Sequence, residues 1–373
     1  MDKEDIRNLF YGLHNKTHLA ACSRSPLLKD VKTSMDQYFD DVQELGNPWE
    51  LWTQKVNEAR SLFARLINAS EKEIAVLYSV SSCLNAVMSA MDFDRKKSVV
   101  TTDLEFPTTN FALLGYEKYG AKIVTIKNVN GSIDPEDYER YIDESTVLTT
   151  VTHVSSLNGF TQNIGEIGKK AHEKGSFLYV DDYQSLGSNP VDVKKDEIDF
   201  LASGNLKWLL GVSGIAFLYV NERISDHLEP SNIGWFSQKD PFKFGAGKLD
   251  YASGARRFEN GTWSIPSTYA SIEGMKTVIR NKSYIESENR KLFRLALESA
   301  REKEFPVSTP DRSSNILALS AKEPHMVEKR LREKYNIITS ARGDSIRVSP
   351  HFYNTEEEIE DAMDIIGEQL KTP

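Results

Sequence analysis

Hydrophobic residues along the chain follow two alternating spacings. Between residues 48 and 68 they recur every three or four positions, at Trp52, Val56, Ala59 and Phe63, which predicts an amphipathic helix. Beyond it, short apolar runs are separated by stretches with helical spacing. These runs are continuously apolar, which is typical of strands buried on both faces. The predicted strands are Ile74–Ser79, Ser98–Thr102, Lys122–Ile126, Thr146–Thr152, Ser176–Val180, Asp199–Ala202 and Gly214–Val220, with helices near 83–91, 108–119, 135–142 and 163–174.

This alternation predicts an α/β fold, in which a large domain holds a mainly parallel seven-stranded sheet between helices. After about residue 270 the pattern changes to that of a smaller α+β domain. Its last helix begins at Thr355, which forms a capping box with Glu358. The other predicted elements of this domain are a long helix at about 272–303, a strand Asn315–Leu319, a helix His325–Tyr335 and strands Ile337–Ser340 and Ser345–Ser349.

The composition agrees with two globular domains. The chain has 373 residues, of which 39% are hydrophobic and 27% charged, enough for a substantial core. We expect an N-terminal arm over residues 1–40 packed with the small domain, a large cofactor-binding domain over 41–265, and a small C-terminal domain over 266–373.

Charge and cysteine content narrow the classes of partner. A net charge of −9 argues against a nucleic-acid or membrane-surface binder, because neutralising phosphates needs a basic surface. We expect no membrane span, because no run of about 18 apolar residues is present. The N-terminus also lacks the apolar segment of a signal peptide. The only cysteines are Cys22 and Cys83, so we expect no metal site and a reducing, cytoplasmic location.

The candidate chemistry lies just after two buried strands. Asp181 and Asp182 end one strand, and ligands of open α/β sheets bind beyond the carboxyl ends of the strands. Lys207 follows the next strand, between the apolar residues Leu206 and Trp208. Apolar surroundings lower the pKa of a lysine and leave a neutral amine, which can form a Schiff base with an aldehyde.

A Schiff-base lysine beside a carboxylate indicates pyridoxal 5'-phosphate. This cofactor needs a lysine for its aldehyde, a carboxylate that keeps its pyridine nitrogen protonated, and a phosphate site. The serine-rich segment 79–83, followed by a helix expected from about Leu84, is a candidate phosphate site because the N–H groups of a helix start bind anions. A nicotinamide-dependent oxidoreductase is not supported, because no G-x-G-x-x-G follows an early strand.

With these residues in place, the chain resembles the class V aminotransferase family of fold-type I pyridoxal-phosphate enzymes. That group includes cysteine desulfurases, kynureninases and isopenicillin N epimerase-like proteins. The resemblance covers most of the chain. The segments that carry it are EFPTTNF (105–111), THVSSLNG (152–159), VDDYQSLGSNPVDV (180–193), SGNLKWLLGVSGIAFLYV (203–220), GWF (234–236), ARRFENGT (255–262) and IRVSPHFYN (346–354).

The resemblance implies a homodimer with shared active sites and a role for each matched residue. Lys207 would form the Schiff base and move protons, Asp181 would hold the pyridine nitrogen, and Gln184 would bind the phenolic oxygen. Arg347 would bind the substrate carboxylate. The other implied cofactor contacts are Ser156 and Phe106 (or Phe111) at the ring, Ser81, Ser82, Cys83 and Ser203 at the phosphate, and Thr262 and Trp235 at the phosphate of the neighbouring subunit.

The motifs leave the reaction open. An amino acid or small amine is the expected substrate and transamination the expected reaction. The alternatives are a pyridoxal-phosphate lyase or epimerase and, in another class, a non-catalytic binding protein of the same fold. Kynureninase is less favoured because of Thr109 and Gln184, and Leu206 stands where many relatives carry His or Tyr. A persulfide-forming desulfurase is disfavoured, because such enzymes need a mobile cysteine in the C-terminal part and none follows Cys83.

Overall fold

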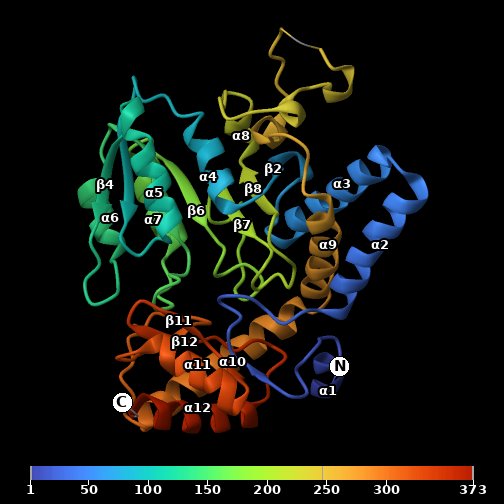
Figure 1. Cartoon of the computed structure of the whole chain (residues 1–373). Coiled ribbons are helices and arrows are strands. Elements are labelled where there is room, and N and C mark those ends of the chain that lie inside the picture. The colour runs from blue at the N-terminus through green and yellow to red at the C-terminus, as the bar shows by residue number, and fades with distance from the viewer. Residues whose placement is uncertain (1, 246, 372–373) are drawn as a thin grey trace.

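The computed structural model describes residues 2–245 and 247–371, which form two lobes (Figure 1). The larger lobe holds a seven-stranded sheet with helices on both sides. The smaller lobe, below it in the view, holds two short sheets and the helices of the C-terminal part. The predicted α/β class is confirmed. Among the described residues, no helix is long and apolar enough to cross a membrane.

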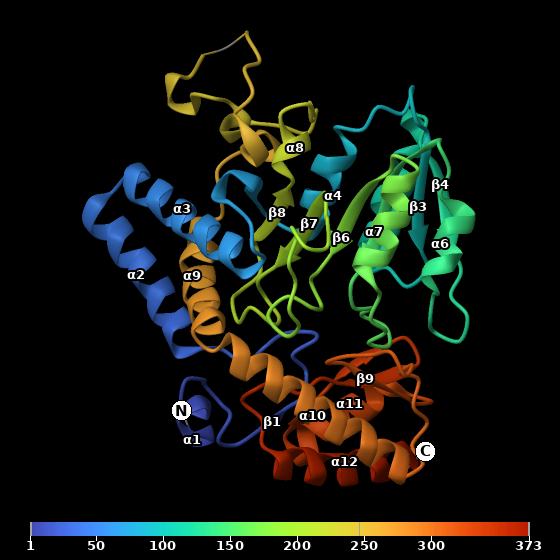
Figure 2. The same ribbon diagram turned by 180° about the vertical axis from the view of Figure 1, so that it is seen from behind.

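The large sheet contains all seven predicted strands, in the order β2-β8-β7-β6-β5-β3-β4. Strand β8 runs antiparallel to both of its neighbours, and the remaining pairs are parallel. The carboxyl ends of β5, β6 and β7 therefore meet at one edge, which faces the small lobe (Figure 2). The strands are β2 (Ile74–Leu77), β3 (Ser98–Thr102), β4 (Lys122–Ile126), β5 (Thr146–Thr152), β6 (Phe177–Asp181), β7 (Phe200–Gly204) and β8 (Ala216–Val220).

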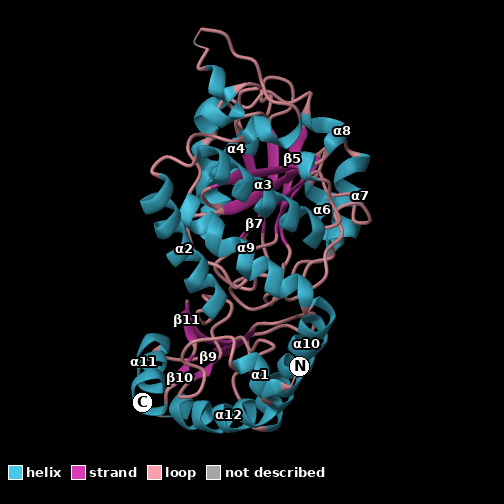
Figure 3. Cartoon of the chain, turned by 90° about the vertical axis from the view of Figure 1, so that its right-hand side faces the viewer, coloured by secondary structure: helices cyan, strands magenta, loops and turns pink. Residues whose placement is uncertain are grey.

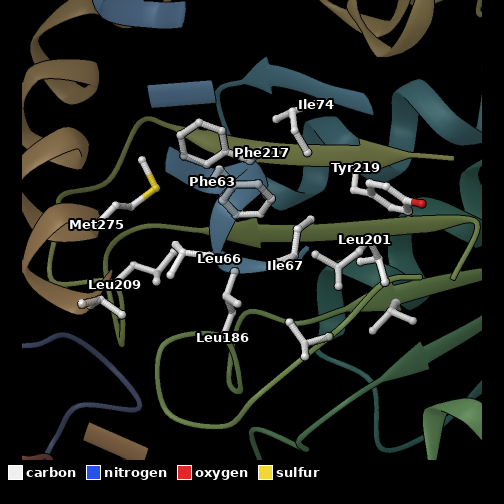
Figure 4. Close-up of a cluster of buried hydrophobic side chains, with 14 of the residues drawn as sticks. Phe63, Leu66, Ile67, Ile74, Leu186, Leu201, Leu209, Phe217, Tyr219 and Met275 are labelled. Atoms are coloured by element: carbon white, nitrogen blue, oxygen red, sulfur yellow. The ribbon is translucent and has the colours of Figure 1, made fainter. Parts of the chain in front are cut away.

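Helices cover both faces of this sheet and supply the core. The Phe63 ring stacks on that of Phe217 at 4.5 Å between centroids, and Met275 and Leu209 lie nearby in the same cluster (Figure 4). Burying side chains of this size stabilises the fold by about 1.5–3 kcal/mol each. The helices of the large lobe are α2 (Lys29–Leu45), α3 (Trp49–Leu66), α4 (Val80–Met88), α5 (Pro107–Gly115), α6 (Pro135–Tyr141), α7 (Ile164–Glu173), α8 (Glu222–Ser225) and α9 (Ile265–Arg280).

Two helix predictions need correction, and three helices were not predicted. The expected single helix at 272–303 is two helices, α9 and α10 (Lys282–Glu302). They are separated at Asn281, whose backbone leaves the helical region at φ −113° and ψ 12°. Helix α4 begins at Val80 rather than near Leu84, because the Ser79 hydroxyl accepts the Ser82 N–H at 3.1 Å and caps the first turn. The unpredicted helices are the short α1 (Lys3–Arg7) and α8, together with α2, of which only Val31 is buried.

The larger of the two sheets in the small lobe has three antiparallel strands, and helices of the C-terminal part pack around it (Figure 3). The Thr355 hydroxyl accepts the Glu358 N–H at 3.0 Å and Glu358 accepts the Thr355 N–H at 3.2 Å, which confirms the predicted capping box. The strand predicted at 337–340 is two strands in different sheets. The elements are β9 (Leu317–Ser320), α11 (Pro324–Tyr335), β10 (Ile337–Ile338), β11 (Ser340–Arg342), β12 (Ser345–Val348) and α12 (Glu356–Lys371).

The N-terminal arm contacts both lobes. In α1 (Lys3–Arg7), Lys3 and Arg7 form ion pairs with Glu288 at 2.7 Å and Glu358 at 2.8 Å in the small lobe. Strand β1 (Thr17–His18) pairs with β10. The following helix, α2, instead packs on α9. The arm therefore passes between the lobes, at the edge where the parallel strands end.

Candidate active site

Asp181 is the last residue of β6, at the edge of the sheet that faces the small lobe. It lies opposite Thr152 of β5 and Ala202 of β7, and it is only 6% exposed. Its Oδ1 accepts the N–H of Tyr183 at 3.0 Å. Burial raises the pKa of this carboxyl to about 6, although the Tyr183 N–H and the charge of Lys207 both oppose the rise. Asp181 is thus a buried acid that is ionised at neutral pH.

Lys207 lies three residues beyond the end of β7. Its backbone carbonyl accepts the hydroxyl of Ser25 at 2.7 Å. Its Nζ lies 4.1 Å from the ring centroid of Tyr183 and 5.8 Å from that of Phe106. Burial lowers the pKa of the amine to about 8, and the charge of Asp181 partly offsets that effect. Lys207 is thus a desolvated amine that senses the charge of Asp181, and its role as the Schiff-base lysine stays a prediction.

Tyr183 contributes an aromatic surface that sequence reasoning did not identify. A Cβ on Gly204 would lie 2.4 Å from its Cζ, so the tyrosine ring occupies the space that a side chain at position 204 would need. Burial raises the pKa of Tyr183 to about 12, so it is a neutral phenol at physiological pH. The pairing of a bulky residue with a glycine more than 20 positions away carries no local sequence signal.

Gln184 is held by the N-terminal arm and by the residue after Lys207. Its Nε2 donates to the carbonyl of Cys22 at 2.9 Å, and its Oε1 accepts the indole N–H of Trp208 at 3.2 Å. One Nε2 hydrogen is left for a further acceptor, since a primary amide has two. The arm is held in this position because the backbone N–H of Cys22 donates to the hydroxyl of Ser349 at 3.0 Å.

The candidate phosphate residues lie in the first turn of α4 and at the end of β7. Ser81 donates its hydroxyl to Thr108 at 3.2 Å, and the hydroxyls of Ser82 and Ser79 are 2.9 Å apart. The thiol of Cys83 is fully buried in the core on the sheet side of α4, and burial raises its pKa. Ser203 is buried, with its hydroxyl 3.3 Å from the carbonyl of Gly204.

Arg347 comes from β12 of the small lobe and is 1% exposed. Its Nη1 donates to the carbonyl of Ser156 at 2.6 Å, which joins two of the predicted site residues across the lobes. Its Nη2 donates to the hydroxyl of Ser340 at 2.7 Å. Both partners are neutral, and the charge of Arg347 reaches Lys207, where it lowers the pKa of the amine. Arg347 is therefore a buried cation that has no carboxylate among its hydrogen-bond partners in the described part of the chain.

The remaining predicted residues are placed farther out. Phe106 precedes α5 and is partly exposed at the site, whereas Phe111 on α5 is 72% exposed. The carbonyl of exposed Thr262 accepts the hydroxyl of Tyr78 at 2.8 Å, just before the cap of α4. The indole of Trp235 donates to the Pro241 carbonyl at 2.7 Å within an aromatic cluster.

A further buried acid, Glu105, lies just before Phe106. Its Oε1 accepts the Thr152 N–H at 2.8 Å, and its Oε2 has no partner among the described residues. Burial, followed by the charge of Asp181, raises its pKa to about 8, so it is largely protonated at neutral pH. Asp182, by contrast, is paired with His153 at 2.7 Å, away from the lysine. This pairing is structural and needs no catalytic role for Asp182.

Comparison with known proteins decides the family. Residues 20–361 match the family model described as "Aminotransferase class-V". The chain belongs to the class V aminotransferase family. This membership confirms the predicted resemblance, and it makes the protein a pyridoxal-phosphate enzyme of the aminotransferase and cysteine desulfurase group.

Individual class V relatives span the chain almost completely. An uncharacterized aminotransferase, YcbU, from Bacillus subtilis is 36% identical over 366 residues, covering 98% of this chain and 97% of the relative. A probable cysteine desulfurase from Methanothermobacter thermautotrophicus is 30% identical over 404 residues, covering 100% and 98%. Relatives that match along almost their whole length are thus named both as aminotransferases and as cysteine desulfurases.

Solved structures show that the fold is shared. The apo structure of the cysteine desulfurase from Thermococcus onnurineus NA1 has a TM-score of 0.88 at 26% identity, covering 99% of this chain and 98% of the other. The cystine C-S lyase C-DES, solved with cysteine persulfide, has a TM-score of 0.87 at 19% identity, covering 96% and 99%, and supports the fold alone.

Proposed function

We propose that this class V enzyme is an aminotransferase that acts on an α-amino acid through Lys207. The observation that carries the proposal is the placement of the buried Lys207 amine with the buried Asp181 carboxylate at the ends of adjacent strands. Arg347 faces the same space from the small lobe. An amine, an acid and a guanidinium are the groups needed for an aldehyde, a pyridine nitrogen and a substrate carboxylate.

The residues present fit the cofactor of the family. Among the described residues, the Asp181 side chain accepts a backbone N–H and contacts no cation, so its buried charge is not neutralised by an ion pair. A protonated pyridine nitrogen would supply that cation. Gln184 would hold the phenolic oxygen with its second Nε2 hydrogen, and Phe106 and Ser156 would border the ring.

The first turn of α4 suits a phosphate. Because the helix begins at Val80, Ser81 and Ser82 lie where backbone N–H groups and hydroxyls converge and where the helix dipole is positive. Ser203 would add a hydroxyl from the end of β7. The fully buried thiol of Cys83 would lie behind these groups rather than among them.

Bound pyridoxal phosphate supplies an electron-accepting ring conjugated to the substrate α-carbon. Lys207 supplies the proton chemistry. With a pKa near 8 the Nζ amine exchanges protons close to neutral pH, which suits a group that removes a proton from one atom and returns it to another. Arg347 orients the substrate through its carboxylate, and the aromatic faces of Tyr183 and Phe106 exclude water around Nζ.

We also propose that the enzyme works as a homodimer with shared active sites. Thr262 is exposed, and Trp235 belongs to a cluster that extends to the exposed ring of Phe244. These residues would meet the phosphate of the neighbouring subunit. Sedimentation velocity should give a mass of twice 42.2 kDa, and a monomer that retains activity would overturn the shared site.

A second candidate is carbon–sulfur bond cleavage of cysteine or cystine. It is favoured by the similarity to the probable cysteine desulfurase. Against a persulfide-forming reaction, the chain has no cysteine after Cys83. Cys22 lies near the site, but it is buried in a small cluster with Trp208 and Val154 and is not presented as a mobile nucleophile.

The first test is cofactor attachment. Purified protein should be yellow, and borohydride should bleach it and leave the reduced cofactor on the peptide that contains Lys207, as identified by mass spectrometry. Lys207→Ala should lose turnover and retain weakened cofactor binding. Attachment to another lysine, or a variant with full turnover, would show that Lys207 is wrongly assigned.

The second test separates the two reactions. The holoenzyme is incubated with single amino acids, with and without a 2-oxo acid acceptor. A transaminase forms a new amino acid only when the acceptor is present. A lyase releases ammonia or sulfide without one. Release of sulfide from cysteine without any acceptor requirement would overturn the aminotransferase proposal in favour of the second candidate.

A further inference from the structure

A second arginine lies on the same face of the small sheet as Arg347. Strands β11 and β12 are antiparallel, with Ser340 opposite Arg347 and Arg342 opposite Ser345. Directly opposed residues share a face, and so do residues two positions apart on one strand. Arg342 and Arg347 are therefore diagonal neighbours on one face, within reach of one small ligand because their side chains are long.

This face is turned toward the site. Arg347 on it donates to the carbonyl of Ser156 in the large lobe. The charges of Arg347 and Arg342 both reach Lys207, and each lowers the pKa of its amine. The two guanidiniums and the lysine amine thus lie around one space between the lobes.

Among the described residues, neither guanidinium contacts a carboxylate. The hydrogen bonds of Arg347 go to the neutral groups of Ser156 and Ser340. Arg342 is exposed, and within residues 2–245 and 247–371 it forms no ion pair at 4.0 Å or less. Other cations of the small lobe are paired with carboxylates, as in the contacts of Lys291 with Glu356 and of Arg301 with Asp311.

We infer that the enzyme selects α-amino acids that carry a second acidic group on a short side chain, with Arg347 binding the α-carboxylate and Arg342 the side-chain acid. This inference rests on the proposed function and names its substrate class. A substrate with one carboxylate neutralises one guanidinium and leaves the charge of the other unmatched. A dianionic substrate neutralises both, and each planar guanidinium can grip a carboxylate with two N–H groups.

The inference is tested by binding as well as by turnover. Calorimetry on the holoenzyme compares succinate and glutarate, which carry two carboxylates, with butyrate, which carries one. Turnover compares aspartate and glutamate with their amides, asparagine and glutamine. The variants are Arg342→Gln, Arg347→Gln and, as a control, Arg332→Gln, which removes an exposed arginine on α11.

We expect the wild type to bind a dicarboxylate about 10- to 100-fold more tightly than butyrate, the range expected for one hydrogen-bonded charge pair. Arg342→Gln should remove that difference and leave butyrate binding unchanged. Arg347→Gln should weaken both classes, and Arg332→Gln neither. Turnover of the acids over their amides should follow the same pattern in kcat/KM.

The possible outcomes separate this inference from the proposed function. Dicarboxylate preference that depends on Arg342, in an enzyme that transfers no amino group, would sustain the inference and overturn the transaminase proposal. Transamination with equal kcat/KM for acids and amides would sustain the function and overturn the inference. An equal loss of butyrate and succinate binding in Arg342→Gln would also overturn the inference. Arg342 would then act on the carboxylate that both ligands carry, or on folding.

Discussion

The reactivity of Lys207 can be calculated from its surroundings. With a pKa of about 8 instead of 10.5, about 9% of the amine is neutral at pH 7, against about 0.03% for an ordinary lysine. The neutral amine is the nucleophile, so Lys207 should react with an electrophile about 300-fold faster at pH 7 than a lysine of equal access and intrinsic nucleophilicity.

Two substitutions should move this pKa in opposite directions. The Asp181 carboxylate favours the charged amine, so Asp181→Asn should lower the pKa of Lys207 further below 8. The Arg347 guanidinium disfavours the charged amine, so Arg347→Gln should raise that pKa. A purely structural disturbance that admits water would raise the pKa in both variants, since hydration stabilises the charged form.

Competitive labelling measures this pKa directly. Cofactor-free protein is treated with trace isotopically labelled acetic anhydride between pH 6 and pH 11, and mass spectrometry quantifies the Lys207 peptide. An Nα-acetyl-lysine peptide in the same tube corrects for the reagent. A labelling midpoint near pH 8 would support the calculation. A wild-type midpoint near pH 10, or a shift in the same direction in both variants, would refute it.

Three further predictions concern stability. Glu259→Ala would leave the buried Arg60 without its 2.6 Å partner and should lower the free energy of unfolding by about 3–5 kcal/mol in urea titrations; a loss below about 1 kcal/mol would contradict this. His351 stays neutral in the fold, because burial lowers its pKa from 6.5 to about 3. Between pH 3 and pH 6.5 the unfolded chain therefore binds a proton at His351 that the folded chain does not. The free energy of unfolding should fall by up to about 1.4 kcal/mol per pH unit as pH decreases from 6.5 toward 3. His351→Gln should reduce this slope. Gly204→Ala should cost about 1–3 kcal/mol through the clash with Tyr183, and Tyr183→Ala should relieve that clash. Equal slopes of unfolding free energy against pH for wild type and His351→Gln would contradict the explanation for His351. Additive losses of unfolding free energy in the Gly204→Ala, Tyr183→Ala double variant would contradict the clash.

The strands of the large sheet could be predicted because burial on both faces leaves continuous apolar runs. Helix α2 could not, because only Val31 of it is buried and most of its residues are polar or charged. The break at Asn281 was missed for a different reason. Helical spacing continues on both sides of it, with Met275 and Val278 buried before it and Ile285 after it, so periodicity alone does not reveal a change of direction.

The chemical groups of the site could be proposed from sequence, but their partners could not. Lys207 and Asp181 stand out because each interrupts or ends an apolar run. The contacts of Gln184 with Cys22 and of Arg347 with Ser156 join segments more than 150 residues apart, and such pairings depend on the tertiary fold. Tyr183 was overlooked because an aromatic residue after a strand is most simply explained as core packing.

The course of the N-terminal arm has a practical consequence for dividing or extending this protein. Ser25 binds the carbonyl of Lys207, and Cys22 binds the side chain of Gln184, while Ala20 pairs with Ser349 of the other lobe. A large lobe excised at residue 41 would keep the lysine and the acid but lose the segment that holds the loops around them. The segment up to residue 25 therefore holds the loops around the proposed site, and fusion partners or truncations at this end should disturb that site.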